Sequence, residues 1–265
     1  MVRINLLVFV AVLLCFNFNI GKFVGTKLGL TASHKATLKD TYYTGYVLAA
    51  SWAKTTCAMK TCNPNLNIPN NIFNLHGLWP TDLENNNSPA DCYYSSLNLP
   101  SLSADVQNIV KTYWNSLYGP MESFVGHEWS KHGTCMNFKL ANLANVPLNL
   151  KALVQNGVNA FNQASDIPRE ETFIRMSAAL SQTYNFYSAL ASKGIYPGSS
   201  LILLEDVQNA LKTYFKVSKV NVYCGKTGAR TMNISEVRIC LSNDFIPVDC
   251  PNDTVGCPKQ FYYTN

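Results

Sequence analysis

The hydrophobic pattern of the chain predicts strands near both ends and helices in the middle. Residues 42–53 (YYTGYVLAASWA) combine aromatic, small apolar and β-branched side chains, which is typical of a buried strand. Residues 71–80 (NIFNLHGLWP) predict a second strand, ended by Gly77 and Pro80. In the last fifty residues, KVNVYC and EVRICL predict two more strands, joined by the glycine-containing turn GKTGAR.

Between these strands, apolar positions recur at the three- and four-residue spacing of an α-helix. The first such stretch runs from Val106 to Leu117 and stops at Gly119 and Pro120. Further helices are predicted from about residue 122 to Gly133 and over residues 150–164, 170–192 and 204–215. Strands, then helices, then strands favour a single α+β domain with a mostly antiparallel sheet.

The N-terminus has the pattern of a secretory signal. Arg3 precedes an apolar run, residues 6–16, that is too short to cross a bilayer. We expect residues 1–25 to be a signal peptide, with an approximate end, and residues 26–265 to be the domain. No small-x-small cleavage site follows the run, so an uncleaved anchor is the alternative. No other stretch could cross a membrane, and we expect a monomer without stable membrane association once the signal is removed.

Cysteine usage agrees with an oxidising compartment. Of nine cysteines, Cys15 lies in the apolar run, which leaves eight. They are expected to form four disulfides, in any of 105 pairings, and none lies in a C-x-x-C pair typical of zinc sites. Three N-x-S/T sequons are candidates for glycosylation: Asn86, Asn233 and Asn252.

The charge of the chain adds little. A formal net charge of +5 over 265 residues is only a weak indication of a nucleic-acid partner.

The stretch HEWSKHGTC, residues 127–135, carries more chemistry. It differs by one residue from the zinc-binding pattern H-E-x-x-H. At about 100° per residue, His127 and His132 would be about 140° apart on a helix, which opposes joint metal binding. Glu128 and Lys131 fall within the same arc, whereas Trp129 and Ser130 fall outside it.

Three of the four histidines lie in HGLWP and HEWSKHG. If the strand with His76 packs against the helix with Glu128, Lys131 and His132, the site holds two imidazoles, a cation and a carboxylate. One imidazole can accept a proton from an attacking hydroxyl and another can protonate a leaving oxygen, while the cation stabilises phosphoryl charge. In RNA the substrate's own 2′-OH supplies the attacking group, so no metal or other cofactor is predicted and DNA should be inert.

Together, FNLHGLWP and HEWSKHGTC resemble the two signature boxes of the ribonuclease T2 family of secreted or lysosomal endoribonucleases. The resemblance extends through YNFYSALASKGIYPGSS and the C-terminal cysteines. It implies an α+β fold with a central antiparallel sheet flanked by helices, single-stranded RNA as the substrate, and a secreted, lysosomal or vacuolar location.

The resemblance also assigns roles to the residues of the two boxes. His132 resembles the base that accepts the 2′-OH proton, and His76 the acid that protonates the 5′-oxygen. Glu128 and Lys131 resemble stabilisers of the pentacovalent phosphorus, and His127 a phosphate-binding group. Trp79 resembles an aromatic residue near the base-binding site, with a core position as the alternative reading.

By the same resemblance, the expected disulfides are Cys57–Cys62, Cys92–Cys135, Cys224–Cys257 and Cys240–Cys250. The chain departs from the family at Ser51, Trp52 and Ala53, where many relatives carry Gln-Trp-Pro, and at Thr81 and Asp82 after the first box. These departures concern base preference and leave the proton-transfer set intact. The alternatives to an endoribonuclease are a secreted RNA-binding or signalling protein without activity, and a zinc hydrolase.

Overall fold

A computed structural model describes residues 41–264, apart from positions 65, 67, 68, 161, 162, 164, 230 and 254. The predicted signal peptide, residues 1–25, lies outside the described residues. The main sheet has the strand order β2-β1-β5-β4-β7. These strands are β2 (Asn74–Thr81), β1 (Gly45–Ser51), β5 (Met232–Ser242), β4 (Asn221–Lys226) and β7 (Val255–Gly256).

The sheet is mostly antiparallel. β1 pairs antiparallel with β2 on one side and with β5 on the other, and β5 pairs antiparallel with β4. Only β7 against β4 and a single position of β8 against β5 are parallel pairs among the described residues. The short strands at the margin are β3 (Leu201–Leu203), β6 (Pro247–Val248) and β8 (Gln260–Tyr262).

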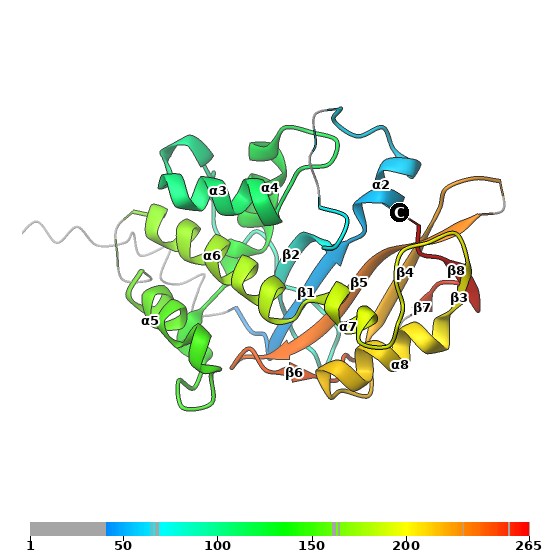
Figure 1. The fold of residues 1–265 in the computed structure, drawn as a ribbon. Coiled ribbons are helices and arrows are strands. Elements are labelled where there is room, and N and C mark those ends of the chain that lie inside the picture. The colour runs from blue at the N-terminus through cyan, green and yellow to red at the C-terminus, as the bar shows by residue number, and fades with distance from the viewer. Residues whose placement is uncertain are drawn as a thin grey trace, which may run out of the picture.

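The helices cover one face of this sheet and its β2 edge (Figure 1). α6 crosses the sheet over β1 and β2, with α5 and α3 beside it, and α7 and α8 follow towards the other end. Their bounds are α2 (Ala53–Met59), α3 (Ala104–Tyr113), α4 (Met121–Lys131), α5 (Lys151–Ala160), α6 (Ile167–Thr183), α7 (Phe186–Ala191) and α8 (Leu204–Phe215). The structure therefore confirms the α+β class with a central, mostly antiparallel sheet flanked by helices.

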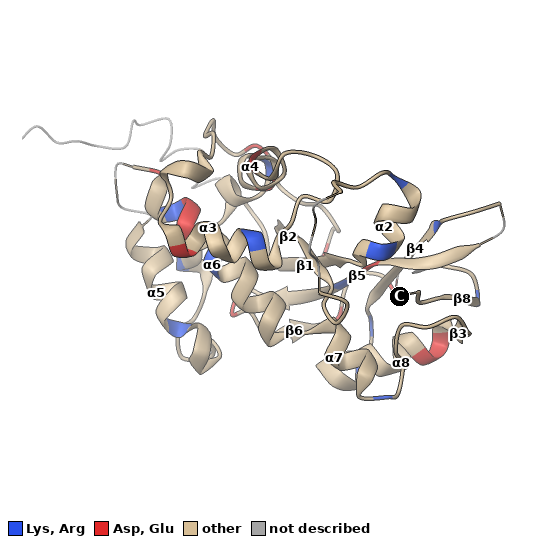
Figure 2. Ribbon diagram, turned by 45° about the horizontal axis from the view of Figure 1, so that its top comes forward, with Lys and Arg blue, Asp and Glu red and all other residues tan. Residues whose placement is uncertain are grey.

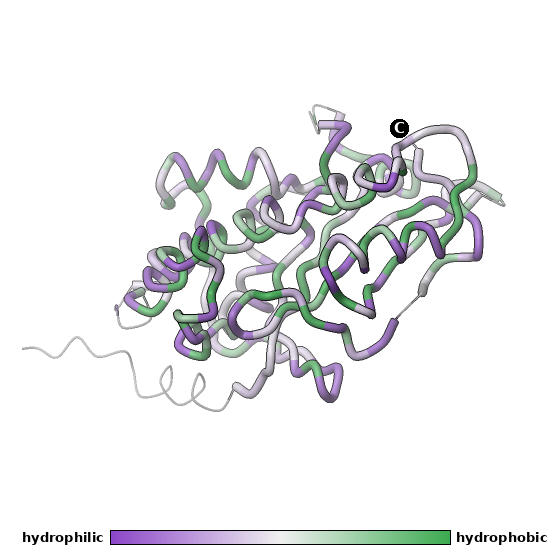
Figure 3. The backbone as a smooth tube through the Cα atoms, turned by 60° about the horizontal axis from the view of Figure 1, so that its bottom comes forward, coloured by the Kyte–Doolittle hydropathy of each residue, from purple (hydrophilic) through white to green (hydrophobic). Residues whose placement is uncertain are grey.

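The two faces of the sheet differ in polarity because side chains alternate along each strand. On β1, Tyr46, Leu48 and Ala50 are buried in the main core, whereas Ser51 lies on the opposite face. The helices likewise alternate between hydrophilic and hydrophobic positions along their length, as Figure 3 shows. The face of the sheet without the main core is therefore available for polar chemistry.

Most predicted elements are confirmed, but several boundaries were wrong. α3 ends at Tyr113 and not near Leu117, and β2 continues through Gly77 and Pro80 to Thr81. The helix predicted over residues 170–192 is two helices, α6 and α7, because the chain leaves the helical conformation at Tyr184. Asn185 then caps α7 by accepting a hydrogen bond from the Ser188 backbone N–H. The first predicted strand ends at Ser51, and its last predicted residue, Ala53, begins the unforeseen helix α2.

All four predicted disulfides are present: Cys57–Cys62, Cys92–Cys135, Cys224–Cys257 and Cys240–Cys250. Cys92–Cys135 ties the loop after β2 to the turn that follows α4. The Cys92 backbone N–H also donates a hydrogen bond to Thr134 Oγ1 within the same junction. The Cys92–Cys135 disulfide therefore holds the end of the second motif against the segment that follows the first.

The sequons differ in their surroundings. Asn86 and Asn252 are exposed. Asn233 is only 2% exposed, and its Nδ2 donates a hydrogen bond to Thr227 Oγ1. A glycan on Nδ2 would have to occupy the space of this buried contact, so the structure argues against Asn233 as a glycosylation site.

Among the described residues, the basic side chains come from many separate elements (Figure 2). Figure 2 shows Lys and Arg scattered over several helices and strands. Among the described residues, every helix is too short or too polar to cross a bilayer.

Candidate active site

An irregularity in β2 places His76 on the sheet face opposite the main core. Ala49 of β1 pairs with Gly77, but the next residue, Ala50, pairs with Leu75, so His76 is an extra residue in β2. Such a β-bulge lets two consecutive residues share one face of the sheet. Leu75 and Leu78 remain buried in the main core on the other face.

α4 carries the second motif to the edge formed by β2. Trp129 faces the core, packs against Phe173 of α6 and donates a hydrogen bond of 3.0 Å from Nε1 to Ser95 Oγ. Trp129 is therefore a core residue, on the side of the helix away from the ionisable groups of the motif. Its neighbour Glu128 is also buried, but its Oε2 accepts a hydrogen bond of 2.8 Å from Nε1 of Trp79. The two sequence motifs therefore meet at Trp79 and Glu128.

Gly77 makes this meeting possible. A Cβ atom at position 77 would collide with both Trp79 Nε1 and Glu128 Oε2. Since the φ of Gly77 lies outside the left-handed region, the requirement is for space and not for an unusual backbone conformation.

His76 lies between two carboxylates. Its Nε2 is 3.9 Å from Glu128 Oε1, and its Nδ1 is 2.5 Å from Glu236 Oε2 of β5. Burial by itself lowers the pKa of His76, but the hydrogen bond and charge of Glu236, together with the charge of Glu128, outweigh it and raise the pKa above the ordinary value. The surroundings of His76 therefore stabilise its protonated form relative to an ordinary histidine.

His132 has the opposite electrostatic environment. It ends α4 as the C-cap residue, is 8% exposed, and its ring lies 5.4 Å from that of Trp79. Burial and the positive charges of Lys131, His127 and His76 lower the pKa of His132 to about 3. Its Nδ1 has no hydrogen-bond partner among the described residues. His132 is therefore a neutral imidazole at neutral pH.

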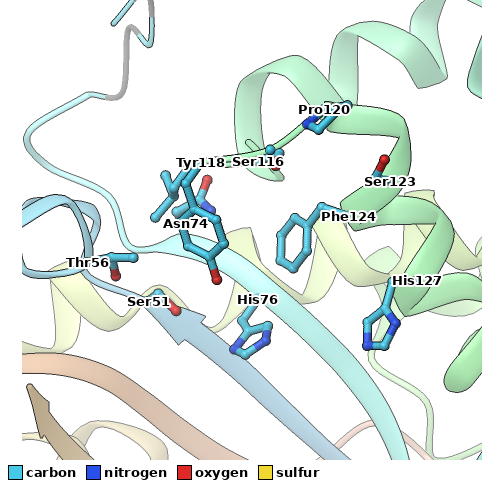
Figure 4. A pocket seen from close by; sticks show the side chains of 12 residues that line it. Ser51, Thr56, Asn74, His76, Ser116, Tyr118, Pro120, Ser123, Phe124 and His127 are labelled. Carbon is cyan, nitrogen blue, oxygen red and sulfur yellow. The ribbon is translucent and has the colours of Figure 1, made fainter. Parts of the chain in front are cut away.

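His127 and Lys131 border these groups. Burial raises the pKa of Glu128, and the charge of His76, the hydrogen bond from Trp79 and the charges of His127 and Lys131 offset only part of this effect. His127 is exposed and lines a cavity of about 260 Å³ together with His76, Phe124 and Tyr118. Figure 4 shows the His76 and His127 rings on the wall of this cavity, one from β2 and the other from α4. The structure thus brings together His76, His127, Glu128, Lys131 and His132, as the two motifs predicted.

Two residues of this site were not foreseen from the sequence. Glu236 contacts His76, and Nε of Arg238 is 2.5 Å from Glu236 Oε1. The Arg238 guanidinium lies over the rings of Trp79 and Tyr223, at 4.8 and 4.5 Å from their centroids. Glu236 and Arg238 belong to EVRICL, where alternation indicates only which side chains share a face. The pairing of β5 with β1 was needed to place them near His76.

Trp79 is half-buried and has neighbours on several sides. Its ring contacts His76 edge to face at 5.1 Å, in addition to His132 and Arg238. Trp79 therefore organises the site whether or not it also stacks on a nucleobase, which remains a prediction.

Within the described part of the chain, no three His, Cys, Asp or Glu side chains are arranged as a metal site. The two histidines of the second motif lie in different surroundings, since His127 is exposed and His132 is buried.

The comparison with known proteins agrees with this arrangement. A profile of the Ribonuclease T2 family matches residues 43–250, which is most of the chain and includes both motifs. The chain belongs to the Ribonuclease T2 family, and the resemblance drawn from the two motifs is confirmed. By its family it is a T2-type ribonuclease.

Its relatives include ribonucleases of several organisms. Ribonuclease Rh of Rhizopus niveus is 29% identical over 163 residues, which cover 59% of this chain and 60% of that protein. Ribonuclease Oy of Magallana gigas is 26% identical over 247 residues, covering 85% of this chain and 97% of that protein. Among solved structures, RNase NT in complex with 5′-AMP has a TM-score of 0.64 at 22% identity and covers 84% of this chain and 98% of that one. This last similarity supports the fold.

Proposed function

We propose that this ribonuclease is an endoribonuclease that cleaves single-stranded RNA through attack of a 2′-OH on the adjacent phosphorus, leaving a 2′,3′-cyclic phosphate. The observation that carries the proposal is a pair of histidines whose surroundings shift their pKa values in opposite directions. The pKa of His76 is raised and that of His132 is lowered to about 3, although both rings contact Trp79. Cleavage by this route needs one acid and one base at the same time.

In the proposed reaction, neutral His132 accepts the proton of the 2′-OH as the 2′-oxygen forms a bond to phosphorus. The bond from phosphorus to the 5′-oxygen breaks, and protonated His76 transfers its proton to that oxygen. The reaction therefore consumes no water in this step and needs no external base. Because DNA lacks the 2′-OH, it is bound at most and not cleaved.

The remaining motif side chains stabilise charge on the phosphoryl oxygens. Lys131 supplies a cation, and exposed His127 on the cavity wall supplies a phosphate-binding group. Glu128 acts in a way that depends on its protonation. Burial raises its pKa, and in the protonated form its carboxyl group can donate a hydrogen bond to a phosphoryl oxygen. In its ionised form the same carboxylate orients His76 and Trp79.

The substrate subsites are proposed on either side of His76. Trp79 offers an aromatic ring for stacking on a nucleobase, an interaction worth about 1 to 3 kcal/mol. On the opposite side, the cavity lined by Phe124 and Tyr118 has room for a further base. Ser51, which replaces a glutamine found in many relatives, also lines this cavity.

The cellular setting belongs to the same proposal. Residues 1–25 direct the chain into the secretory pathway, and the remaining domain acts as a secreted, lysosomal or vacuolar monomer without stable membrane association. Four disulfides are consistent with an oxidising compartment. Asn86 and Asn252 are the candidate glycosylation sites, both exposed.

The proposal is tested with an oligodeoxynucleotide that contains a single ribonucleotide, incubated with the oxidised protein in excess EDTA. Mass spectrometry of the products should show cleavage only 3′ of the ribonucleotide and a 2′,3′-cyclic phosphate end. All four bases at the ribose should be tried over a range of pH. A folded protein that leaves every substrate intact would favour the inactive RNA-binding or signalling protein, and activity only with added zinc would favour the metal hydrolase.

A further inference from the structure

The contact between His76 and Glu236 spans three strands. His76 is on β2 and Glu236 is on β5, with β1 between them. Neighbouring strands lie about 4.8 Å apart, so β2 and β5 are separated by roughly 10 Å. The residues of β1 on this face, Ala49 and Ser51, are small and sit opposite Arg238 and Glu236. The two side chains can therefore meet above β1.

Glu236 is itself held in place by two further groups. Ser51 Oγ donates a hydrogen bond of 3.3 Å to Glu236 Oε2, the same oxygen that contacts His76. The other oxygen, Oε1, accepts from Nε of Arg238. Arg238 in turn lies over the rings of Trp79 and Tyr223. The carboxylate is only 12% exposed, so these contacts leave it little freedom to turn away from the imidazole.

The charged groups that face His76 come from two elements. Glu236 and Arg238 lie on β5, and Glu128 lies on α4. His132, at the end of α4, is also electrostatically coupled to His76. Of these groups, Glu236 alone is in hydrogen-bond contact with the ring, through Nδ1. The protonation and orientation of His76 therefore depend on Glu236 more directly than on any other side chain of this set.

We propose that Glu236 is a positioning residue for the general acid, and that Ser51 and Arg238 fix its carboxylate. A carboxylate that accepts the Nδ1–H bond leaves Nε2–H as the proton that is passed to the 5′-oxygen. After the transfer, His76 keeps its Nδ1 proton and regains an Nε2 proton from solvent, while His132 releases to solvent the proton that it took from the 2′-OH. The departure from the family at Ser51 thus acquires a role, since its hydroxyl donates to this carboxylate. The inference rests on the proposed cleavage reaction and deepens it.

The test compares two substrates that differ in the need for an acid. One is a dinucleotide such as UpA, whose 5′-alkoxide is a poor leaving group. The other is uridine 3′-(4-nitrophenyl phosphate), whose phenolate leaves without protonation. The variant Glu236→Gln keeps the size and an acceptor oxygen but removes the charge. Its kcat on UpA should fall by about ten- to a hundredfold, part of the roughly 10²- to 10⁴-fold contribution of a general acid, while kcat on the aryl ester changes less than about threefold.

Two further variants calibrate this result. His76→Ala should show the same substrate dependence with a larger loss on UpA. Glu205→Gln removes an exposed carboxylate from the first turn of α8 and should leave both rates unchanged. An equal loss on the two substrates, or no loss on UpA, would overturn the role of Glu236. A wild-type protein that cleaves neither substrate would instead overturn the proposed reaction itself.

A measurement on the wild-type protein keeps the inference testable if Glu236→Gln fails to fold. Two-dimensional ¹⁵N NMR of the histidine rings reports which nitrogen carries the proton and at what pH the ring titrates. We expect His76 to keep its proton on Nδ1 in the neutral ring and to titrate above the ordinary histidine value of about 6.5. A neutral ring protonated on Nε2, or titration at or below that value, contradicts the pairing whether or not RNA is cleaved.

Discussion

The indole Nε1 of Trp79 donates a hydrogen bond to Oε2 of Glu128 across 49 positions of sequence. This bond joins β2 to α4 and thereby joins the two motifs into one site. Gly77 leaves the space in which it forms, and the rings of His76 and His132 both pack against the same indole. The arrangement predicts how the site responds to substitutions that do not touch the proton-transfer residues.

Replacement of Trp79 by Phe should separate the two functions of this residue. The variant keeps an aromatic face but leaves the buried Glu128 without its donor, and a hydrogen bond to a charged group contributes about 1.5 to 3 kcal/mol. We expect kcat on a dinucleotide to fall by about tenfold or more, since each 1.36 kcal/mol corresponds to about tenfold in rate. If stacking on a base is the only role of Trp79, kcat will be retained and KM will change little.

Replacement of Gly77 by Ala should damage both stability and activity. The added methyl group collides with Trp79 Nε1 and Glu128 Oε2, and overpacking of this kind costs about 1 to 3 kcal/mol. Gly126→Ala, on α4, is the matched control because its Cβ would meet no atom within 4 Å. In a helix interior that change should stabilise by about 0.5 to 1 kcal/mol. Urea unfolding and kcat of both variants check the prediction, which fails if the two behave alike.

The pH dependence of kcat/KM should be a broad bell, because the pKa values of the two histidines shift in opposite directions. The base must be neutral, and the pKa of His132 of about 3 places the acidic limb near that value. The acid must be protonated, and the raised pKa of His76 places the alkaline limb above the ordinary histidine value. The rate of dinucleotide cleavage, measured as a function of pH at constant ionic strength, gives both limbs. An acidic limb near pH 6.5 would show that another group is the base.

Stability should also depend on the protonation of His132. The unfolded chain binds a proton at His132 as the pH falls through about 6.5, whereas the folded protein binds it only near 3. Between these values the unfolded state holds more protons, so the free energy of unfolding decreases as the pH falls. The decrease between pH 6.5 and 3 should be smaller in a His132→Asn variant. Parallel curves for the two proteins would contradict the lowered pKa.

The disulfide between Cys92 and Cys135 should be the most stabilising of the four. It closes the longest loop, with a sequence separation of 43 against 5 for Cys57–Cys62. Chain entropy then predicts losses of about 4 and about 2 kcal/mol when the respective pairs are replaced by Ala. Denaturant unfolding of the two double variants measures the difference. Because the Cys92–Cys135 disulfide also anchors the end of α4, the variant that lacks it should lose activity as well.

Much of the fold could be predicted from local patterns. The periodicity of residues 204–215 predicts α8 with both boundaries, and α4 begins and ends within two residues of its predicted limits. The prediction failed at residues 170–192, where apolar spacing continues through Tyr184 although the backbone turns there. Side-chain periodicity shows only which positions are buried. Because α6 and α7 follow each other closely and both bury apolar side chains, the apolar spacing continues across the break between them.

The sequence by itself determined the chemical groups of this protein: two motifs, rich in histidine, that place His127, Glu128, Lys131 and His132 on one helix and His76 on one strand. The residue types and their spacing in the two motifs indicate proton transfer. Both can be read from the sequence, because they depend only on covalent identity and on local helix or strand geometry. Only the tertiary structure decided in which direction the pKa of each histidine shifts. The pKa of His76 is raised by Glu236, which lies 160 positions away and reaches it across β1, and that of His132 is lowered chiefly by burial. Both effects depend on through-space distance and solvent exclusion, and neither quantity is encoded in local sequence spacing.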